Sequence, residues 1–410
     1  MGELNNKRIL LGVTGSIAAY KSADLIRQCR RAGAEVQVVM SQAAEEFITA
    51  QTLQALSGKP VRSHLLDTEA EAAMGHIELA RWADLILVAP TSADFMARLV
   101  QGRADDLLTA VCLASDSPLA LAPAMNHVMW SNAATQANCQ TLIKRGVTLL
   151  GPDIGDQACG ETGPGRMLEP LAILPLIIAL FNTGSLVGVN VMITAGPTQE
   201  NIDPVRYISN RSSGKTGYAL ARAAAEAGAR VTLVSGPVSL PVPEGVQCIK
   251  VRSAQAMYDE VIARVGKRDL FIAAAAVADY RPVASTPDKI RKAKDTFELA
   301  LEPTADIIAE VASTSPTTFT VGFAAETGDL DVRAEAKRAK KGLDIIVGNQ
   351  VGIDDEGQPF GFDSDENTLS VYQESGILRL PKAHKNKLAR KLITIIAKHY
   401  HEKNSGQDTR

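Results

Sequence analysis

Two short segments, about half a chain apart, each join an apolar run to small residues. The first covers residues 8–18 (RILLGVTGSIA) and the second covers residues 190–198 (NVMITAGPT). Such a segment predicts a buried strand that turns directly into a helix, where small residues leave backbone N–H groups and the positive helix end open to an anion. The pair therefore predicts two nucleotide-type sites, and hence two activities.

Both halves alternate strand and helix patterns, which predicts an α/β fold of two three-layer domains with doubly wound parallel sheets. In the first half we expect strands at 8–13, 34–40, 84–89, 118–123 and 147–150, and helices at 16–32, 42–56, 92–100 and 131–145. In the second half we expect strands at 189–194, 230–235, 269–275, 318–323 and 343–347, and helices at 214–228, 253–265, 304–313 and 329–341.

The chain ends in a different pattern. Segment 354–380 fits an appended hairpin, 383–400 a closing helix, and the last ten residues are expected to fray. The polar stretch 182–185 is the expected boundary, which gives a first domain over 1–184, a second over 185–404 and a frayed tail over 405–410.

Composition excludes several classes of partner. The 410 residues carry a formal net charge of −3, so we expect no nucleic-acid partner and no anionic membrane surface. No apolar signal core precedes the first strand, and the apolar run 171–181 is too short to span a bilayer, so we expect a cytoplasmic protein. Five cysteines without a Cys-x-x-Cys pair predict reduced thiols rather than disulfides or a zinc site.

The first glycine turn lacks the Gly-x-Gly-x-x-Gly spacing of dinucleotide binders. It favours a single phosphate, held by Ser16 and the helix start, over a pyrophosphate. Taken alone, the segment fits a tight turn without a ligand equally well.

Four further motifs stand in the first half: 73–79 (AMGHIEL), 88–94 (VAPTSAD), 122–126 (APAMN) and 158–167 (ACGETGPGRM). Together they resemble the homo-oligomeric flavin-containing cysteine decarboxylases. The resemblance implies a flavoprotein-type domain in which the first glycine turn and the Ser92-Ala93 pair hold the phosphate of FMN. The FMN contacts that it implies are Gly15, Ser16, Ile17, Ser41, Ser92 and Met125.

The same resemblance assigns three catalytic roles. His76 would be the active-site histidine, Asn126 would bind the substrate carboxylate, and Cys159 would be the proton donor on a flap over the substrate. Singly, these residues fit a surface histidine, a helix cap and an idle loop thiol, and the combination of motifs favours catalysis. The chemistry is consistent with FMN, because loss of carbon dioxide from a cysteine amide needs an electron sink that hydride removal by a flavin creates.

Two carboxylates depart from the family pattern. Asp94 and Asp105 stand where we expect asparagine. A carboxylate beside a phosphate is unfavourable unless it is paired or points away.

The second half contains Ser213-Gly214-Lys215-Thr216, which looks like the end of a Walker A loop, but Ser209 stands where that motif needs glycine. The motifs present instead are 193–198 (ITAGPT), 203–215 (DPVRYISNRSSGK), 275–280 (AAVADY), 288–292 (DKIRK) and 322–327 (GFAAET). They resemble phosphopantothenate-cysteine ligase.

Both halves, in this order and over about residues 7–400, resemble the bacterial bifunctional phosphopantothenoylcysteine decarboxylase and phosphopantothenate-cysteine ligase of coenzyme A synthesis. The resemblance implies a Rossmann-like second domain that uses CTP and Mg²⁺ to convert 4'-phosphopantothenate into an acyl-cytidylate, which the amine of cysteine attacks. The product is the substrate of the first domain. It also implies a homo-oligomer with trimers of the first domain and dimers of the second, which allows a dodecamer.

For the ligase, the resemblance implies that Asn210 binds the pantothenate carboxylate and that Lys289 stabilises the reacting phosphoryl region. The CTP contacts that it implies are Ala273, Ala274, Ala275, Asp279, Lys289, Thr304, Asp306, Ile307, Phe323, Lys337 and Lys341. Asp279 is also the candidate Mg²⁺ ligand, and no other metal ligand is assigned. Outside their motifs the lysines would fit a solvated helix face. Ala305 stands where the family has proline, which leaves that loop less restricted.

Two alternatives stay open. A nicotinamide-dependent oxidoreductase predicts a Gly-x-Gly-x-x-Gly turn followed by an acidic residue at the end of the next strand, and neither half has that pairing. A catalytically inactive flavin-binding regulatory protein predicts loss of His76 or Cys159, and both are present.

Overall fold

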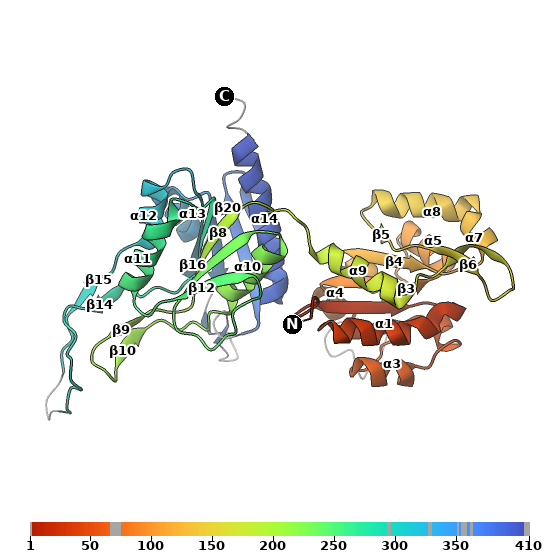
Figure 1. Cartoon of the computed structure of the whole chain (residues 1–410), viewed down its shortest axis with the longest axis horizontal. Helices are drawn as coiled ribbons and strands as arrows, with labels where there is room; N and C mark the ends of the chain where they lie inside the picture. Colours follow the sequence, from red (N-terminus) through yellow and green to blue (C-terminus); the bar gives the residue numbers. More distant parts are fainter. Residues whose placement is uncertain are drawn as a thin grey trace. The chain divides into compact units, whose positions relative to one another are not determined.

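The computed structural model describes residues 2–65, 75–292, 297–326, 330–350, 352–353, 359–360 and 364–405. The chain divides into two compact units, Met1–Phe181 and Asn182–Arg410, and each has its own sheet and cores (Figure 1). The polar stretch expected at the boundary, 182–185, directly follows the last helix of the first unit. Among the described helices, none combines the length and apolar character that crossing a membrane requires.

The first unit contains a five-stranded parallel sheet in the order β2-β1-β3-β4-β5. Its strands are β1 (Arg8–Val13), β2 (Glu35–Met40), β3 (Leu85–Thr91), β4 (Leu119–Pro123) and β5 (Thr148–Leu149). Because the chain moves from β1 outward to β2 and then back to β3, the topological switch point lies between β1 and β3. Open α/β sheets bind ligands beyond the carboxyl ends of their strands at such a point.

Helices cover both faces of this sheet, because successive strand side chains point to opposite sides. Ile9 and Leu11 pack with α1, α3 and α9, whereas Leu10 packs with α4, α5, α6 and α8. The helices of this unit are η1 (Ile17–Ala19), α1 (Tyr20–Arg31), α2 (Gln42–Glu45), α3 (Ala50–Ser57), α4 (Gly75–Trp82), α5 (Ala93–Gln101), α6 (Leu107–Ala114), α7 (His127–Ser131), α8 (Ala133–Lys144) and α9 (Pro170–Phe181). A hairpin of β6 (Asp153–Asp156) and β7 (Thr162–Arg166) precedes α9.

Two predicted helices in this half are wrong in detail, and three helices of the structure were not predicted. The helix expected at 42–56 is two helices, since Thr49 accepts a hydrogen bond from the N–H of Thr52 and starts α3 anew. The helix expected at 131–145 begins only at Ala133, because Asn132 caps it. Helices α4, α6 and α7 were not predicted from the pattern.

The second unit contains an eight-stranded sheet in the order β12-β11-β8-β13-β16-β17-β20-β21, parallel except for its last two pairings. Its strands are β8 (Asn190–Ala195), β11 (Arg230–Ser235), β12 (Val246–Lys250), β13 (Leu270–Ala273), β16 (Phe319–Glu326), β17 (Ile345–Gln350), β20 (Glu366–Gln373) and β21 (Gly376–His384). The chain runs from β8 out to β12 and returns at β13, which confirms the predicted Rossmann-like order.

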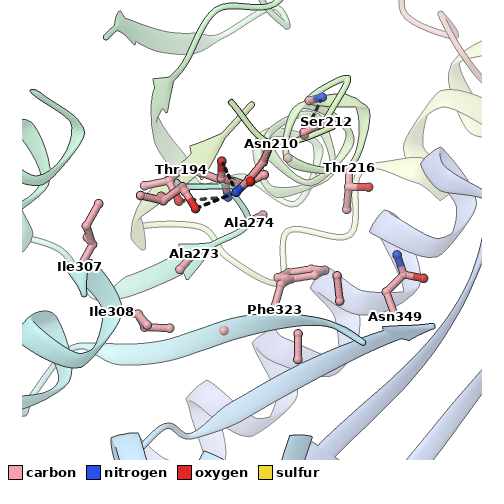
Figure 2. A pocket seen from close by; sticks show the side chains of 18 of the residues that line it. Thr194, Asn210, Ser212, Thr216, Ala273, Ala274, Ile307, Ile308, Phe323 and Asn349 are labelled. Carbon is pink, nitrogen blue, oxygen red and sulfur yellow. Dashed lines mark hydrogen bonds between the residues drawn. The ribbon is translucent and has the colours of Figure 1, made fainter. Parts of the chain in front are cut away.

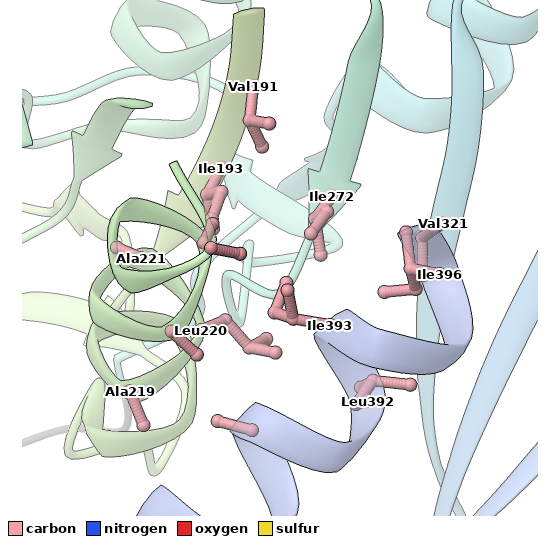
Figure 3. Close-up of a cluster of buried hydrophobic side chains, with 14 of the residues drawn as sticks. Val191, Ile193, Ala219, Leu220, Ala221, Ile272, Val321, Leu392, Ile393 and Ile396 are labelled. Atoms are coloured by element: carbon pink, nitrogen blue, oxygen red, sulfur yellow. The ribbon is translucent and has the colours of Figure 1, made fainter. Parts of the chain in front are cut away.

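Two helical layers again cover the sheet. Its helices are α10 (Lys215–Glu226), α11 (Ala254–Val265), α12 (Ile307–Thr314), α13 (Leu330–Lys341) and α14 (Lys385–Ser405). Figure 3 shows one face, where Leu220 of α10 and Ile393 of α14 meet Ile193 and Ile272 of the sheet. Met192, the neighbour of Ile193, points to the other face with α11, α12 and α13.

Two short hairpins extend from the parallel sheet. One consists of β9 (Gln199–Asn201) and β10 (Tyr207–Ser209), and the other of β14 (Tyr280–Pro282) and β15 (Leu301–Pro303). Figure 1 draws them beside each other within this unit, and β14 packs against β9. A third pair, β18 (Gly352–Ile353) with β19 (Pro359–Phe360), precedes β20.

The predictions for this half also need correction at element ends. The helix expected at 304–313 begins at Ile307 with Asp306 as its cap, and the strand expected at 269–275 ends at Ala273. The closing helix continues to Ser405, so 401–405 do not fray, and 406–410 lie outside the described residues. The appended hairpin expected within 354–380 is present as β20 and β21, although 354–358 and 361–363 lie outside the described residues. Strand β12 and the hairpins β9-β10 and β14-β15 were not predicted.

Candidate functional sites

Loops that follow β1, β2 and β3 meet at the carboxyl edge of the first sheet. The hydroxyl of Thr14 donates to the carbonyl of Pro90 (2.8 Å) and accepts from the N–H of Ser92 (2.9 Å). The N–H of Ser41 donates to the carbonyl of Val13 (3.0 Å). These bonds bring the predicted FMN residues Ser16, Ser41 and Ser92 to one edge, next to the switch point.

This edge fits the phosphate of FMN. Ser16 and Ser92 cap η1 and α5, where N–H groups and the helix dipole favour an anion. The hydroxyl of Ser41 is buried and has no hydrogen-bond partner among the described residues, so it is available to a ligand. A Cβ atom on Gly15 would lie 2.6 Å from the Cβ of Ala43, so glycine alone permits this close approach.

The two unexpected carboxylates do not leave an unpaired charge in the buried part of this edge. Asp94 has a side chain that is 79% exposed, and its carboxylate lies 3.9 Å from Arg98. Asp105 is paired with Arg98 (2.5 Å) and with Arg103. The hydrogen bond from Arg98 lowers the pKa of Asp105, which keeps this carboxylate ionised and neutralised by its partners.

The loop between β6 and β7 carries Cys159 and lies against the end of β4. The side-chain amide of Asn126 lies 3.6 Å from the sulfur of Cys159 and donates to the carboxylate of Glu161 (2.9 Å). The oxygen that accepts from Asn126 is Oε2 of Glu161, and the thiol of Cys159 donates to this same oxygen (3.3 Å). Nδ1 of His127 lies 3.4 Å from Oε2 of Glu161. The backbone joins this flap to β4, since the N–H of Met125 donates to the carbonyl of Gly165 (2.9 Å).

Glu161 was not predicted as a site residue, although it stands within the same motif as Cys159. The hydrogen bond from Asn126, followed by the one from Cys159, lowers the pKa of Glu161, which favours its ionised form. The carboxylate of Glu161 therefore occupies the side-chain amide of Asn126, the group that is expected to bind the substrate carboxylate.

His76 lies apart from this pair. It is in the first turn of α4, and α4 packs against α6. Among the residues that the structure describes, its Nδ1 is buried without a hydrogen-bond partner, and no contact joins it to Asn126 or Cys159. The structure therefore brings two of the three predicted catalytic residues together within one chain. Ala73 and Met74 of its motif lie outside the described residues.

A cavity of about 710 Å³ opens at the carboxyl ends of β8, β13, β16 and β17 in the second unit (Figure 2). Thr194, Ala273 and Phe323 line it from three of these strands, and Asn349 faces it from the fourth. It lies beside the switch point between β8 and β13, where such sheets bind ligands.

Hydrogen bonds hold the loop after β13 as one wall of this cavity. The N–H of Ala275 donates to the hydroxyl of Thr194 (3.3 Å), and the amide of Asn210 donates to the carbonyl of Val277 (2.9 Å). The hydroxyl of Thr304 donates to the backbone carbonyl of Ala278 (2.6 Å), and its N–H donates to the backbone carbonyl of Asp279 (2.9 Å). These bonds hold the loop although Ala305 replaces the expected proline.

Charged groups converge from α12 and α13. Lys341 pairs with Asp306 (2.5 Å), whose carboxylate also accepts from the N–H of Ala309 and caps α12. Burial raises the pKa of Asp306, but the hydrogen bond and charge of Lys341 outweigh it and the pKa is lowered. The ammonium of Lys337 lies 3.4 Å from the carbonyl of Phe323. The cavity thus presents cations held in defined places, as a nucleotide phosphate requires.

Helix α10 supplies another wall. Gly214 begins it in a left-handed conformation with φ of 75°, and Gly217 lets it approach β8 closely, because a Cβ there would lie 2.5 Å from that of Ala195. Lys215, which lines the cavity, pairs with Asp365 (2.7 Å).

The predicted ligase residues therefore gather around one cavity with a single exception. Lining it are Asn210, Ala273, Ala274, Ala275, Asp279, Thr304, Asp306, Ile307, Phe323, Lys337 and Lys341. Lys289 is exposed in the excursion between β14 and β15 and does not line the cavity. Sequence reasoning missed Asn349, Asn367 and Lys385, which come from β17, β20 and α14 and carry no motif. Thr327, the last residue of the motif at 322–327, lies outside the described residues.

Mg²⁺ fits this cavity only together with a nucleotide. Within the described ranges, no three histidine, cysteine or acidic side chains come together as a metal site. Mg²⁺ usually binds one or two carboxylates and completes its shell with water and substrate phosphates. Asp279 lines the cavity and is available for that purpose, since Asp306 is paired with Lys341.

Family models match both units. Residues 1–182 match the model described as "Flavoprotein", and residues 186–400 match that of the "DNA/pantothenate metabolism flavoprotein C-terminal domain". The chain is thus a two-domain flavoprotein of pantothenate metabolism.

Relatives that match the chain over nearly its full length identify its family within this class of flavoproteins. The chain is 53% identical to the coenzyme A biosynthesis bifunctional protein CoaBC of Vibrio vulnificus strain YJ016 over 96% of this chain and 98% of the relative. It is 49% identical to the protein of that description from Escherichia coli K12, over 98% of this chain and 99% of the relative. It belongs to the family of bifunctional coenzyme A biosynthesis proteins. A solved C-terminal domain of such a protein is 36% identical and covers 53% of this chain and 99% of its own, with a TM-score of 0.45.

Proposed function

We propose that the chain catalyses two consecutive reactions of coenzyme A synthesis. The second domain, over 185–404, joins 4'-phosphopantothenate to cysteine with CTP, and the first domain, over 1–184, decarboxylates the product with FMN. The observation that carries this proposal is the end-to-end match to bifunctional relatives, which includes both sets of motifs. We also propose that the chain works in the cytoplasm.

In the first domain, Ser16, Ser41 and Ser92 hold the phosphate of FMN at the carboxyl edge of the sheet. The chemistry that FMN supplies when bound is reversible acceptance of hydride from the carbon that bears the substrate sulfur. Asn126 directs its amide to the substrate carboxylate, which leaves as carbon dioxide. Cys159 gives a proton to the carbon that lost the carboxylate, and the 3.6 Å distance between its sulfur and the amide of Asn126 supports this role.

His76 completes this site from another copy of the chain. The lack of a described contact between His76 and either Asn126 or Cys159 within one chain supports a homo-oligomeric site, in line with trimers of the first domain and dimers of the second. Gly15, Ile17 and Met125 contribute backbone and apolar contacts to FMN.

In the second domain, an oxygen of the pantothenate carboxylate attacks the α-phosphorus of CTP and pyrophosphate leaves. The amine of cysteine then attacks the acyl carbon, CMP leaves, and an amide forms. Asn210 orients the carboxylate, while Lys337 and Lys341 offset charge on the phosphates. Asp279 would hold Mg²⁺ together with the phosphates of CTP, and the ion would offset their negative charge.

A single coupled assay tests both steps. The purified chain is expected to be yellow, to release pyrophosphate from 4'-phosphopantothenate, cysteine and CTP, and then to release carbon dioxide. Cys159→Ser is expected to keep the pyrophosphate yield and to stop at an unsaturated thiol product. Absence of pyrophosphate with CTP would remove the ligase assignment. Full carbon dioxide release by Cys159→Ser would remove the decarboxylase site.

A further inference from the structure

Asp203 is a buried carboxylate in the loop that joins β9 to β10. Its side chain is 0% exposed, whereas the neighbouring guanidinium of Arg206 is 47% exposed. A buried carboxylate is costly unless each oxygen is hydrogen-bonded and the charge is paired. The partners of Asp203 therefore indicate what this group does.

The two oxygens of Asp203 serve different segments. Oδ1 accepts the N–H groups of Val205 (2.8 Å) and Arg206 (2.7 Å), which closes the local turn. Oδ2 accepts from Nε (2.9 Å) and Nη2 (2.5 Å) of Arg206 and from the N–H of Ile290 (3.1 Å). Ile290 is 87 residues away in sequence, so this last bond joins two separate loops.

Arg206 completes the hold on Ile290. Its Nη2 donates to the carbonyl of Ile290 (2.7 Å) while it pairs with Asp203. The N–H and the carbonyl of one residue are thus both fixed by a single ion pair. The guanidinium of Arg206 holds the pKa of Asp203 well below its usual range despite burial, and the N–H groups of Val205, Arg206 and Ile290 add to this effect, so the pair stays charged at neutral pH.

Ile290 directly follows Lys289, and a second bond holds the chain on the other side. The N–H of Thr286 donates to the carbonyl of Ile202 (3.1 Å), the residue before Asp203. Lys289 therefore lies between two attachments to one loop, at 286 and at 290. An exposed lysine in an excursion between two short strands would otherwise sample many positions.

We propose that Asp203 is a positioning residue for the ligase reaction, which holds the backbone at Ile290 and so presents Lys289 at a defined place. This inference rests on the ligase function proposed above and on the role in it that the family resemblance implies for Lys289. Misplacement of a group that acts on the transition state by about 1 Å costs on the order of 100-fold in rate. Loss of the tether should therefore reduce turnover more than substrate binding.

Asp203→Asn separates the two oxygens. The amide oxygen of asparagine still accepts from Val205 and Arg206, but its NH₂ group replaces Oδ2 and cannot accept from Ile290 or from the guanidinium. The local turn persists while the tether to Ile290 is lost. Asp259→Asn, which makes the same chemical change on the exposed face of α11, is the matched control.

Hydrogen exchange of the intact chain tests the tether without any activity. In Asp203→Asn the peptide that contains 286–292 should exchange faster, while peptides from β8 and β13 keep their protection. Asp259→Asn should leave both unchanged. Unchanged exchange at 286–292 would overturn the tether, and general loss of protection in β8 and β13 would overturn a local role.

Ligase kinetics test the consequence. Asp203→Asn should lower kcat about 10- to 100-fold with a smaller change in KM. In the Lys289→Gln background it should add less than about twofold, because two residues that act through one another are not additive. An undiminished effect of Asp203→Asn in that background would overturn the proposal. Failure of the wild-type chain to make pyrophosphate would instead reject the ligase function and leave the exchange result standing.

Discussion

Gly217 offers a direct test of how closely α10 must approach β8. A Cβ there would lie 2.5 Å from the Cβ and 3.1 Å from the Cα of Ala195, and 3.3 Å from the carbonyl oxygen of Thr194. Carbon atoms in contact prefer about 3.5–4.0 Å, so Gly217→Ala must displace the helix by about 1 Å. None of these strand atoms can rotate away.

Two effects of Gly217→Ala oppose each other. Alanine favours a helix interior over glycine by about 0.5–1 kcal/mol. Overpacking of a close contact costs about 1–3 kcal/mol. The cost of overpacking should exceed the gain in helix propensity. The substitution should therefore lower the free energy of unfolding of the second domain by about 1–2 kcal/mol and its Tm by roughly 2–8 °C. Because Ser213 and Gly214 line the cavity just before this helix, ligase turnover should fall about 10-fold or more.

Separate probes resolve the two domains. Both tryptophans of the chain, Trp82 and Trp130, lie in the first domain. The unfolding transition that their fluorescence reports should therefore be the same in the variant as in the wild type. Calorimetry and hydrogen exchange of α10 report the second domain, and decarboxylation by the same sample is the internal control. Gly266→Ala is the matched substitution, since a Cβ there meets nothing within 4 Å and its φ is −61°. A Gly217→Ala chain as stable and active as Gly266→Ala would refute the packing argument.

Two further changes address the sites. Glu161→Gln removes the internal anion from Asn126, so the KM for phosphopantothenoylcysteine should fall about two- to tenfold in a carbon dioxide assay; a higher KM would contradict this. Asp306→Asn keeps the cap of α12 but loses the ion pair with Lys341. Because this ion pair is partly exposed, its loss should lower the free energy of unfolding in urea by less than about 1 kcal/mol. The folded pKa of Asp306 is lowered, so its contribution is present above its unfolded pKa of about 3.9 and disappears as the pH falls through the folded pKa. The stabilities of Asp306→Asn and the wild type should therefore converge in acid, and a constant difference would contradict that sign.

The parallel sheets were predictable because strands such as β1, β3 and β4 are apolar runs with small residues or proline towards their ends. All seven residues of β3, for example, are buried. Element ends were less predictable, since a cap such as Asn132 or Asp306 shifts a helix start by two or three residues without changing the apolar pattern. The short hairpin β9-β10 carries no such pattern, so only coordinates reveal it.

The ligase cavity was predictable where motifs end parallel strands, as at Ala273 and Phe323. Asn349 and Lys385 line the same cavity from β17 and α14, but neither belongs to a motif. Lys385 follows the antiparallel strands β20 and β21, whose pairing the sequence pattern does not place beside the cavity. Lys289 shows the reverse case, because a motif identifies it while the fold of one chain leaves it outside the cavity. A role predicted from a motif does not by itself give a position.

The carboxylate of Glu161 on Asn126 bears on how the first domain empties after each cycle. In the role proposed above for Asn126, the carboxylate of the substrate would displace Glu161, whereas the decarboxylated product would have no carboxylate with which to hold the amide. Return of the flap residue would then expel the product, so a single side chain would couple the completion of chemistry to release. In such a site, the loss of carbon dioxide from the substrate would itself cause release of the product.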